Sequence, residues 1–179
     1  MTRILIAYGT MEGQTAKIAE CIADVIRAHG LDADAVDIKE SQSTIPETYD
    51  GVIVGSSIHM GKHDKHVVNF VKANRDTLQR LPSAFFSVSL AVHGDAAEAE
   101  GYVERFEQET GWRPARLALF AGALLYTQYG FVKRHMLKKI AQDKPGNLGT
   151  DTSRDYVYTE WDGVKRLAED YLSDLTNPE

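Results

Sequence analysis

RILIAYGTMEGQT, residues 3–15, is the stretch of this sequence that decides the fold. Its first six residues form a continuous run rich in Ile and Leu, which is typical of a strand buried on both faces of a parallel sheet. The run ends at Gly9 and passes through a short polar loop into residues 15–29, whose apolar side chains recur at helical spacing. A strand, a tight loop and a helix in this order predict the first unit of an α/β fold.

Apolar runs and amphipathic segments continue to alternate along the rest of the chain. Further strands are predicted over residues 33–38, 51–56, 84–92 and 117–123, and further helices over residues 65–81 and 96–110. A last helix would begin at Thr159, with Asp162 completing a shortened capping box. This alternation favours a parallel sheet with right-handed crossovers. We interpret residues 126–155 as an insertion into one domain that spans residues 1–179.

Composition and charge exclude several classes of protein. Hydrophobic residues make up 43% of the 179 residues and charged residues 26%, as in an ordinary globular domain. The net charge of −6 argues against general nucleic-acid binding, which needs clustered positive charge. The single cysteine, Cys21, excludes an intrachain disulfide and a zinc ribbon. Since the sequence has no secretory signal and no long apolar run, we expect a cytoplasmic location.

The loop after the first strand carries the strongest indication of a ligand. In an open α/β sheet, ligands bind beyond the carboxyl ends of the strands. A phosphate at this loop would meet the free backbone N–H groups of the helix start and the hydroxyls of Thr10 and Thr15. Gly13 would let the backbone close around the anion. The loop therefore predicts a phosphate site, against the alternative of a polar turn with a threonine cap.

Other nucleotide-binding loops fit the sequence less well. A Walker loop would end in Gly-Lys-Ser/Thr, and this loop has no lysine. A dinucleotide fingerprint would have the spacing G-x-G-x-x-G, although Asp37 is placed like the ribose-binding acid of that fold and keeps this alternative open. A phospho-acceptor receiver domain would need an Asp at the end of the third strand, where the sequence has Gly55, Ser56 and Ser57.

Two more loops at the same edge are rich in small and hydroxylic residues. They are GSSIHMG (residues 55–61) and SVSLAVHG (residues 87–94). Such residues let backbone amides approach a flat polar ring, so we expect these loops to contact the edge of one.

Several motifs together give the chain a specific resemblance. The first loop is similar to the phosphate loop of flavodoxins. The combination then resembles the menaquinone-dependent protoporphyrinogen IX dehydrogenase family along nearly the whole chain. The motifs are GQT (13–15), GSSI (55–58), PSAFFSV (82–88), WRP (112–114), AGAL (121–124) with Tyr126 and Tyr129, TDT (150–152) and VYTEW (157–161).

The resemblance implies a flavodoxin-like, doubly wound, five-stranded parallel sheet of order 2-1-3-4-5, with an insertion at the fifth strand. It implies FMN as cofactor, protoporphyrinogen IX as substrate and a quinone as electron acceptor, in haem biosynthesis. An electron-transfer flavodoxin and an NAD(P)H:quinone reductase stay open as alternatives. The implied cofactor-binding residues are Thr10, Met11, Glu12, Gly13, Gln14, Thr15, Ser56, Ser57, Ile58, His59, Met60, Gly61, Ser87, Val88, Ser89, Leu90 and Ala91.

Histidines supply the only other candidates for chemistry. His59 and His93 lie on the predicted rim loops, where either one could donate to the flavin or relay a proton. His59, His63 and His66 have a spacing that could suit a metal, but no carboxylate cluster or cysteine supports one. We favour solvated or flavin-adjacent histidines.

The insertion differs in charge from the rest of the chain. Residues 126–154 hold six Lys or Arg and two Asp, a net charge of +4 within a chain of net charge −6. On a helical wheel, Val132, Met136, Leu137 and Ile140 would lie on one side, and Arg134, Lys138 and Lys139 on the other. With Lys133, these cations could face an anionic bilayer at the inner face of the cytoplasmic membrane or an acidic substrate. The alternative is a helix packed on the sheet with solvated lysines.

Overall fold

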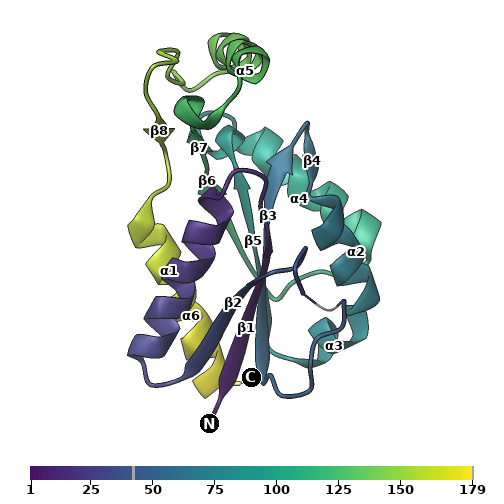
Figure 1. Cartoon of the computed structure of the whole chain (residues 1–179). Coiled ribbons are helices and arrows are strands. Elements are labelled where there is room, and N and C mark those ends of the chain that lie inside the picture. Colours follow the sequence, from purple (N-terminus) through teal and green to yellow (C-terminus); the bar gives the residue numbers. More distant parts are fainter. Residues whose placement is uncertain (42, 179) are drawn as a thin grey trace.

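The computed structural model describes residues 1–41 and 43–178. Its main sheet has the parallel strand order β2-β1-β3-β5-β6, which confirms the predicted order (Figure 1). The register sets Ile6 beside Ile53 and Val54 beside Phe85 in neighbouring strands. The strands are β1 (Arg3–Gly9), β2 (Asp32–Asp37), β3 (Gly51–His59), β5 (Ser83–Ser89) and β6 (Arg116–Ala121), with a short β4 (Lys62–His63) antiparallel to β3.

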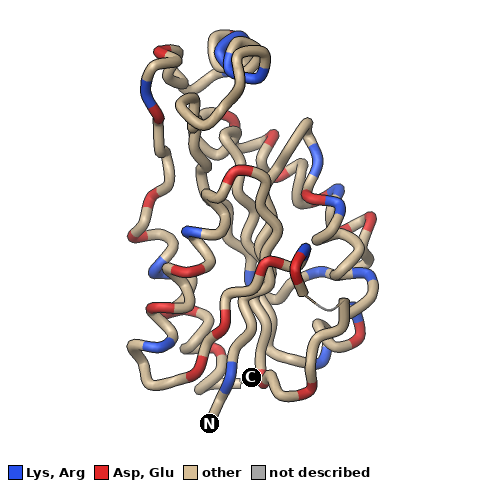
Figure 2. The backbone as a smooth tube through the Cα atoms, viewed as in Figure 1, with Lys and Arg blue, Asp and Glu red and all other residues tan. Residues whose placement is uncertain are grey.

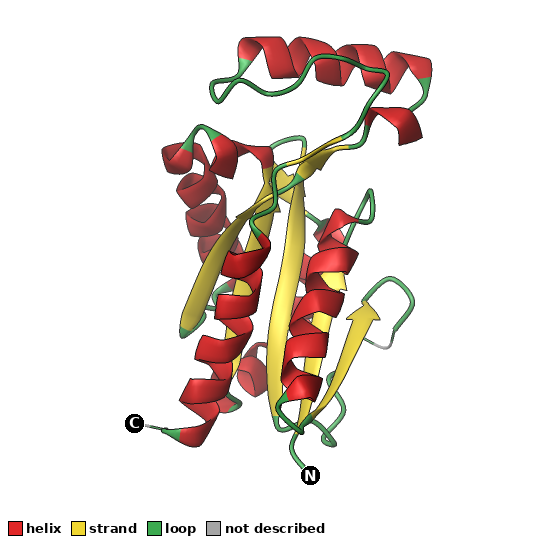
Figure 3. Ribbon diagram, turned by 90° about the vertical axis from the view of Figure 1, so that its left-hand side faces the viewer, coloured by secondary structure: helices red, strands yellow, loops and turns green. Residues whose placement is uncertain are grey.

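Helices cover both faces of this sheet. Helices α1 (Gln14–Ala28) and α6 (Trp161–Thr176) lie side by side on one face, in front of the strands in Figure 3. Helices α2 (Lys65–Ala73), α3 (Arg75–Arg80) and α4 (Ala96–Thr110) lie on the other face. Each face has its own buried hydrophobic cluster, one containing Ile18, Ile53 and Val164, the other containing Val54 and Phe106. The sequence forms this fold because its three central strands, β1, β3 and β5, are buried on both sides.

Two predicted elements are shorter in the structure than in the sequence pattern. The helix predicted over residues 65–81 is broken at Asn74 into α2 and α3. The Asn74 side chain donates to the carbonyls of Ser43 and Phe70 and accepts from the N–H of Ile45, so it joins the break to a neighbouring loop. The strand predicted over residues 84–92 ends at Ser89, and a 3₁₀ turn, η1 (Leu90–His93), follows it.

The predicted cap of the last helix is also wrong. Helix α6 begins at Trp161, its N-cap residue is Glu160, and no side chain caps it. The buried Thr159 hydroxyl instead donates to the Ala121 carbonyl at 2.7 Å and accepts from the Gln14 side-chain amide at 2.8 Å. Thr159 therefore joins the end of β6 to the start of α1.

The segment after β6 leaves the main sheet and returns to it. Strands β7 (Ala123–Leu124) and β8 (Tyr156–Val157) pair antiparallel, so the two ends of the segment lie side by side. Between them are a 3₁₀ turn, η2 (Tyr126–Gln128), and helix α5 (Phe131–Asp143). In Figure 3 α5 lies across the top of the molecule, beyond the carboxyl ends of the strands. Among the described residues, no helix combines the length and apolarity needed to cross a membrane.

Candidate active site at the carboxyl edge of the sheet

A cavity opens where the three central strands end, and both the sheet and the insertion line it. Its floor is formed by loops after β1, β3 and β5, as the sequence predicted for the ligand edge. Its other walls come from the end of β6, from α4 and from the insertion. The lining residues are residues 10–12, 14, 15, 57–61, 88–91 and 122–124, with Tyr102, Tyr129, Lys133, Met136, Leu137, Ile140 and Lys144.

The loop after β1 has the geometry of an anion site. Gly13 has a φ of 93°, in the left-handed region that glycine reaches without strain, and α1 begins at the next residue without a side-chain cap. The N–H of Gly13 donates to the Thr10 hydroxyl oxygen at 2.9 Å, which holds the turn closed. Thr15 is 1% exposed in the first turn of the helix. The helix start is therefore free to bind a negative group from this edge of the sheet.

The loop after β3 is a tight hairpin whose turn reaches the cavity. Met60 and Gly61 both have positive φ, 52° and 75°, between the paired residues His59 and Lys62. Positive φ at both turn positions matches the twist of a two-residue hairpin. Such a conformation is uncommon for methionine, whose side chain is 76% exposed here. The hairpin thus presents backbone and an exposed thioether at the rim of the cavity.

Ser56 and Ser87 support this hairpin and do not line the cavity. The Ser56 hydroxyl accepts from the N–H of Asp64 at 3.1 Å. The Ser87 hydroxyl is 2.8 Å from Nε2 of His63, which is buried against the rings of Phe85 and Phe106. Burial and the nearby charge of Arg105 lower the pKa of His63 to about 4, so this imidazole is neutral at pH 7. His63 is therefore a buried part of the hairpin, which corrects the expectation of a solvated or flavin-adjacent residue.

The other histidines are separated from one another. His59 lines the cavity. His66 is largely exposed, and its ring contacts the Asp64 carboxylate at 3.1 Å. His93 lies outside the cavity, with its ring 4.2 Å from that of Tyr158. Among the described residues no group of His, Cys, Asp and Glu is arranged to hold a metal ion.

Unpaired polar atoms in the cavity indicate a place for a ligand with hydrogen-bonding groups. Within the described chain, Gln14 Oε1, Ser57 Oγ and Ser89 Oγ are buried without a hydrogen-bond partner, and all three residues line the cavity. Leaving a buried polar group unpaired costs about 1–3 kcal/mol, so such groups call for a ligand. Apolar side chains such as Ile58 and Leu90 surround them. This arrangement fits a flat ring with polar edges, joined to a phosphate at the start of α1.

The insertion closes the cavity with one side of α5, where Met136, Leu137 and Ile140 line it. Val132 is 78% exposed and Phe131 is 83% exposed on the outer side of α5. Lys133 lines the cavity, and the half-buried Arg134 donates to the carbonyls of Tyr126 and Tyr129. The helical wheel grouped Val132 with Met136, Leu137 and Ile140, and Arg134 with Lys138 and Lys139. In the structure Val132 is exposed while the rest of its group lines the cavity, and Arg134 is held by backbone carbonyls. Arg134 departs from its group because the carbonyls of Tyr126 and Tyr129 accept hydrogen bonds from its guanidinium.

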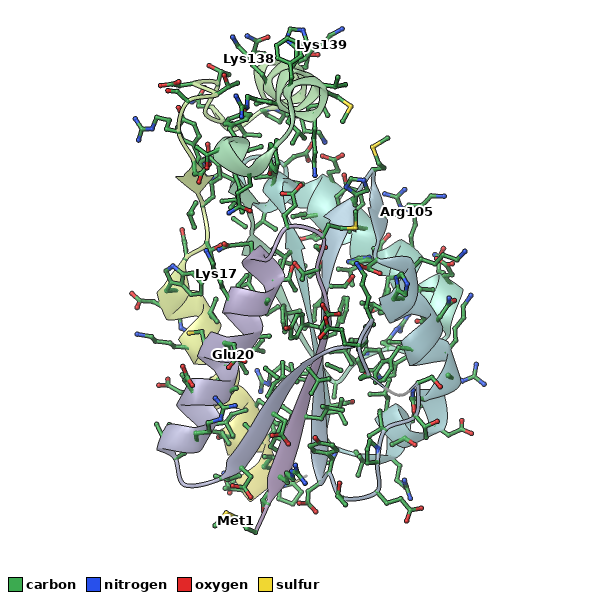
Figure 4. All side chains as sticks on the ribbon, in the orientation of Figure 1. Met1, Lys17, Glu20, Arg105, Lys138 and Lys139 are labelled. Carbon is green, nitrogen blue, oxygen red and sulfur yellow. The ribbon has the colours of Figure 1, made fainter. Side chains whose placement is uncertain are left out.

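Lys138 and Lys139 lie at the outer end of the molecule. Figure 4 labels both at the far end of the molecule, pointing away from the sheet. Figure 2 shows Lys and Arg gathered on α5, while acidic residues are frequent along the rest of the chain. The four cations treated as one patch in the sequence therefore form two pairs, one turned toward the molecule and one toward its surroundings.

Several cavity residues were not singled out as site residues by the sequence. Tyr102 and Lys144 both bind Glu98: the Tyr102 hydroxyl lies 2.6 Å and the Lys144 ammonium 2.7 Å from its carboxylate oxygens. Leu124, Leu137 and Ile140 supply apolar lining. Of these residues only Leu137 and Ile140 belong to the amphipathic pattern of α5, and that pattern gives no indication of where the helix sits on the sheet.

Comparisons with known proteins identify relatives along nearly all of the chain. Residues 5–151 match the family model described as flavodoxin domain. The quinone-linked protoporphyrinogen IX dehydrogenase of Escherichia coli (strain K12) is 34% identical over 178 residues, which cover 98% of this chain and 97% of that protein. The Leishmania major protein of the same name is 34% identical over 175 residues, covering 96% of this chain and 75% of that protein.

Solved structures show the same fold at low sequence identity. Oxidised flavodoxin 1 from Bacillus cereus has a TM-score of 0.57 and 17% identity, covering 99% of this chain and all of that chain. A flavodoxin from the domain Archaea has a TM-score of 0.55 and 16% identity, covering 98% of this chain and all of that one.

Proposed function

Because this chain belongs to the flavodoxin family, together with the quinone-linked protoporphyrinogen IX dehydrogenases, we propose that it is an FMN-dependent enzyme. Its substrate would be protoporphyrinogen IX, which it oxidises to protoporphyrin IX, and its electron acceptor would be a quinone. Family membership implies a flavin cofactor. FMN is the flavin that fits a single phosphate loop, since FMN carries one phosphate and the sequence has no pyrophosphate fingerprint.

The unpaired polar atoms of the cavity are the observation that carries the cofactor assignment. Gln14, Ser57 and Ser89 each hold a buried oxygen that lacks a partner within the described chain. They lie between the uncapped start of α1 and the apolar wall of Ile58 and Leu90. We propose that Thr10, Gly13 and Thr15 hold the phosphate, while the loops at residues 57–61 and 88–91 hold the ring. When bound, the flavin supplies the two-electron chemistry.

The protein's own residues would position the substrate and keep water from the ring. Leu124 of β7, with Leu137 and Ile140 of the insertion, adds an apolar wall to the cavity that the flavodoxin core provides. A tetrapyrrole is large and mostly apolar, so it fits such a wall better than an open, polar rim. Lys133 is the cation of α5 that lines the cavity and would meet a propionate of the substrate. His59 is the histidine placed to donate to the ring or relay a proton, and it stays a candidate.

We further propose that the outer side of α5 contacts the inner face of the cytoplasmic membrane, where quinones reside. Phe131 and Val132 are highly exposed there, and Lys138 and Lys139 point outward from the same helix. Exposed apolar side chains flanked by cations suit the surface of an anionic bilayer.

Anaerobic mixing tests this function directly. The flavin-loaded protein is mixed separately with protoporphyrinogen IX, NADPH and menaquinol, and flavin absorbance is followed. We expect rapid bleaching with protoporphyrinogen IX, slow or no bleaching with NADPH, and recovery of absorbance when a quinone is added. Chromatography of the flavin released by denaturation should give FMN.

Three results would contradict the proposal. Bleaching by NADPH alone would favour a quinone reductase. The absence of bleaching by protoporphyrinogen IX would favour an electron carrier. Release of FAD, or failure of the flavin-free protein to take up any flavin, would remove the cofactor assignment.

A further inference from the structure

Glu12 lies in the middle of the loop after β1, but its carboxylate contacts the insertion. Its Oε1 is 2.7 Å from the ammonium of Lys133, at the start of α5. Its Oε2 accepts a hydrogen bond of 2.5 Å from the Tyr129 hydroxyl, 117 residues away in sequence. One side chain therefore joins the loop that begins α1 to the segment that closes the cavity.

The partners of Glu12 are themselves connected, so the three side chains form a bridge. The Tyr129 hydroxyl accepts from the N–H of Leu125 at 3.0 Å, which fixes it to the base of the insertion. The Lys133 ammonium also lies 4.7 Å from the centre of the Tyr129 ring, within range of a cation–π contact. Burial and the Glu12 carboxylate raise the pKa of Tyr129, so its hydroxyl keeps the proton that it donates.

The negative charge of Glu12 gives its ion pair with Lys133 a role in phosphate binding. A carboxylate in a loop that holds a phosphate would repel that phosphate if it stayed unpaired, because both groups are negative. Pairing with Lys133 removes most of this repulsion. The side chains are only partly exposed, 25% for Glu12 and 35% for Lys133, so solvent screens the pair less than a fully exposed one.

We propose that Glu12 is a positioning residue: it sets α5 over the cavity according to the state of the phosphate loop. This inference rests on the proposed function, since it takes the loop to be the site of the flavin phosphate. A phosphate that orders the loop also orders Glu12, and Glu12 then holds Tyr129 and Lys133. Because coupling between two sites is reciprocal, placement of α5 favours retention of the phosphate in turn. A bound phosphate would thus stabilise the placement of α5 and of the substrate wall that this helix adds to the cavity.

Hydrogen exchange of the backbone amides in residues 131–143 tests this inference without measuring activity. The full chain is compared in three forms: flavin-free, with riboflavin, and with FMN. In the parent protein FMN should slow exchange in α5 by roughly fivefold or more, a typical size for coupling between sites. Riboflavin lacks the phosphate and should slow it less.

Variants of Glu12 should lose this protection. Glu12→Ala should exchange faster than the parent in α5 even without flavin, and FMN should no longer protect the helix. Glu12→Gln keeps an acceptor for Tyr129 but loses the ion pair, so its protection should be intermediate. The charge-swapped double variant Glu12→Lys/Lys133→Glu should recover protection that Glu12→Lys alone lacks. Lys139→Ala, a change on the outer side of the same helix, is the matched control and should behave as the parent.

The outcomes separate this inference from the proposed function. If FMN protects α5 equally in Glu12→Ala and in the parent, or if the charge swap recovers nothing, Glu12 is an ordinary surface ion pair and the inference is wrong. A parent protein that binds no FMN contradicts the cofactor assignment instead, and the flavin-free comparison of parent and Glu12→Ala still decides whether Glu12 positions α5.

Discussion

Thr15 and Thr10 are the residues through which the phosphate site is most directly tested. Thr15 is buried at the start of α1, and the Thr10 oxygen holds the turn through the N–H of Gly13. We expect Thr15→Ala to weaken FMN binding by about 1–2 kcal/mol, because a hydrogen bond to a charged phosphate is lost. Thr10→Ala should act similarly. Fluorescence titration with FMN measures both, and Thr176→Ala, at the far end of α6, is the control.

An FMN affinity in both variants equal to that of the parent would remove these hydroxyls from the site.

Thr159 carries a second prediction at the residue scale. Thr159→Val keeps the shape of the side chain but leaves the Ala121 carbonyl and the Gln14 amide without this partner. Since both bonds are buried, we expect the free energy of unfolding to fall by about 2 kcal/mol. Urea unfolding measures the loss, and Thr127→Val, whose hydroxyl bonds Asp155 in an exposed position, should lose less. Equal losses would contradict the buried role of Thr159.

The sequence predicted which loops form the site better than which of their side chains face it. Thr10, Met11, Gln14 and Thr15 line the cavity as expected. Ser87 lies one residue further from the carboxyl end of β5 than Val88, and Val88 and Ser89 both line the cavity. Val88 lines the cavity and Ser87 turns to His63. The sequence predicts whole runs of residues because it does not show how far from the strand ends the cavity begins.

At the scale of elements, His63 in the β3–β4 hairpin should make the stability of the protein depend on pH. Burial and the charge of Arg105, on α4, lower the pKa of His63 to about 4, from the ordinary histidine value of 6.5. The unfolded chain therefore binds a proton that the folded chain does not, so stability falls as the pH drops from about 6.5 towards 4. The loss should reach about 3 kcal/mol. Unfolding midpoints at pH 7 and pH 4.5 measure it.

His63→Gln is the comparison for this pH dependence. The variant should be less stable than the parent at pH 7, because the ring contacts with Phe85 and Phe106 are lost. Its stability should fall less between pH 7 and pH 4.5. An equal fall in both proteins would assign the acid sensitivity to other groups.

The helices show where patterns predict elements well and where they fail. The extent of α4 was predicted correctly, because an Asp at its start and a Gly at its end punctuate an amphipathic run. The break at Asn74 was missed because its cause is a set of contacts with residues 43–45, which only the folded chain brings near. The position of Arg134 depends on contacts of the same kind, since the carbonyls of Tyr126 and Tyr129 accept hydrogen bonds from its guanidinium.

At the scale of the whole molecule, substitution of Lys138 and Lys139 tests whether α5 contacts a membrane, and substitution of Lys133 and Arg134 tests its packing on the rest of the protein. Lys138→Gln/Lys139→Gln should leave FMN binding and stability unchanged and should weaken binding to anionic vesicles by roughly 1 kcal/mol per charge. Lys133→Gln/Arg134→Gln is the contrasting pair and should instead lower stability, because it removes the Glu12 ion pair and two hydrogen bonds to η2. Vesicle sedimentation at low and high salt measures the first effect.

If the Lys138/Lys139 variant sediments with vesicles as the parent does at low salt, α5 does not bind the bilayer through these charges.

Because β7 pairs with β8, the insertion could be deleted and its two ends joined directly. Leu124 and Tyr156 are directly opposite each other, so an Asn-Gly turn could join them in place of residues 125–155. The excised segment takes with it most of its own small hydrophobic cluster, with Tyr126, Ala141 and Leu148, while the clusters on the two faces of the sheet stay whole. The shortened chain would amount to a minimal flavin carrier, and transplanting the excised segment onto an unrelated flavodoxin at the same strand pair would be the reciprocal experiment.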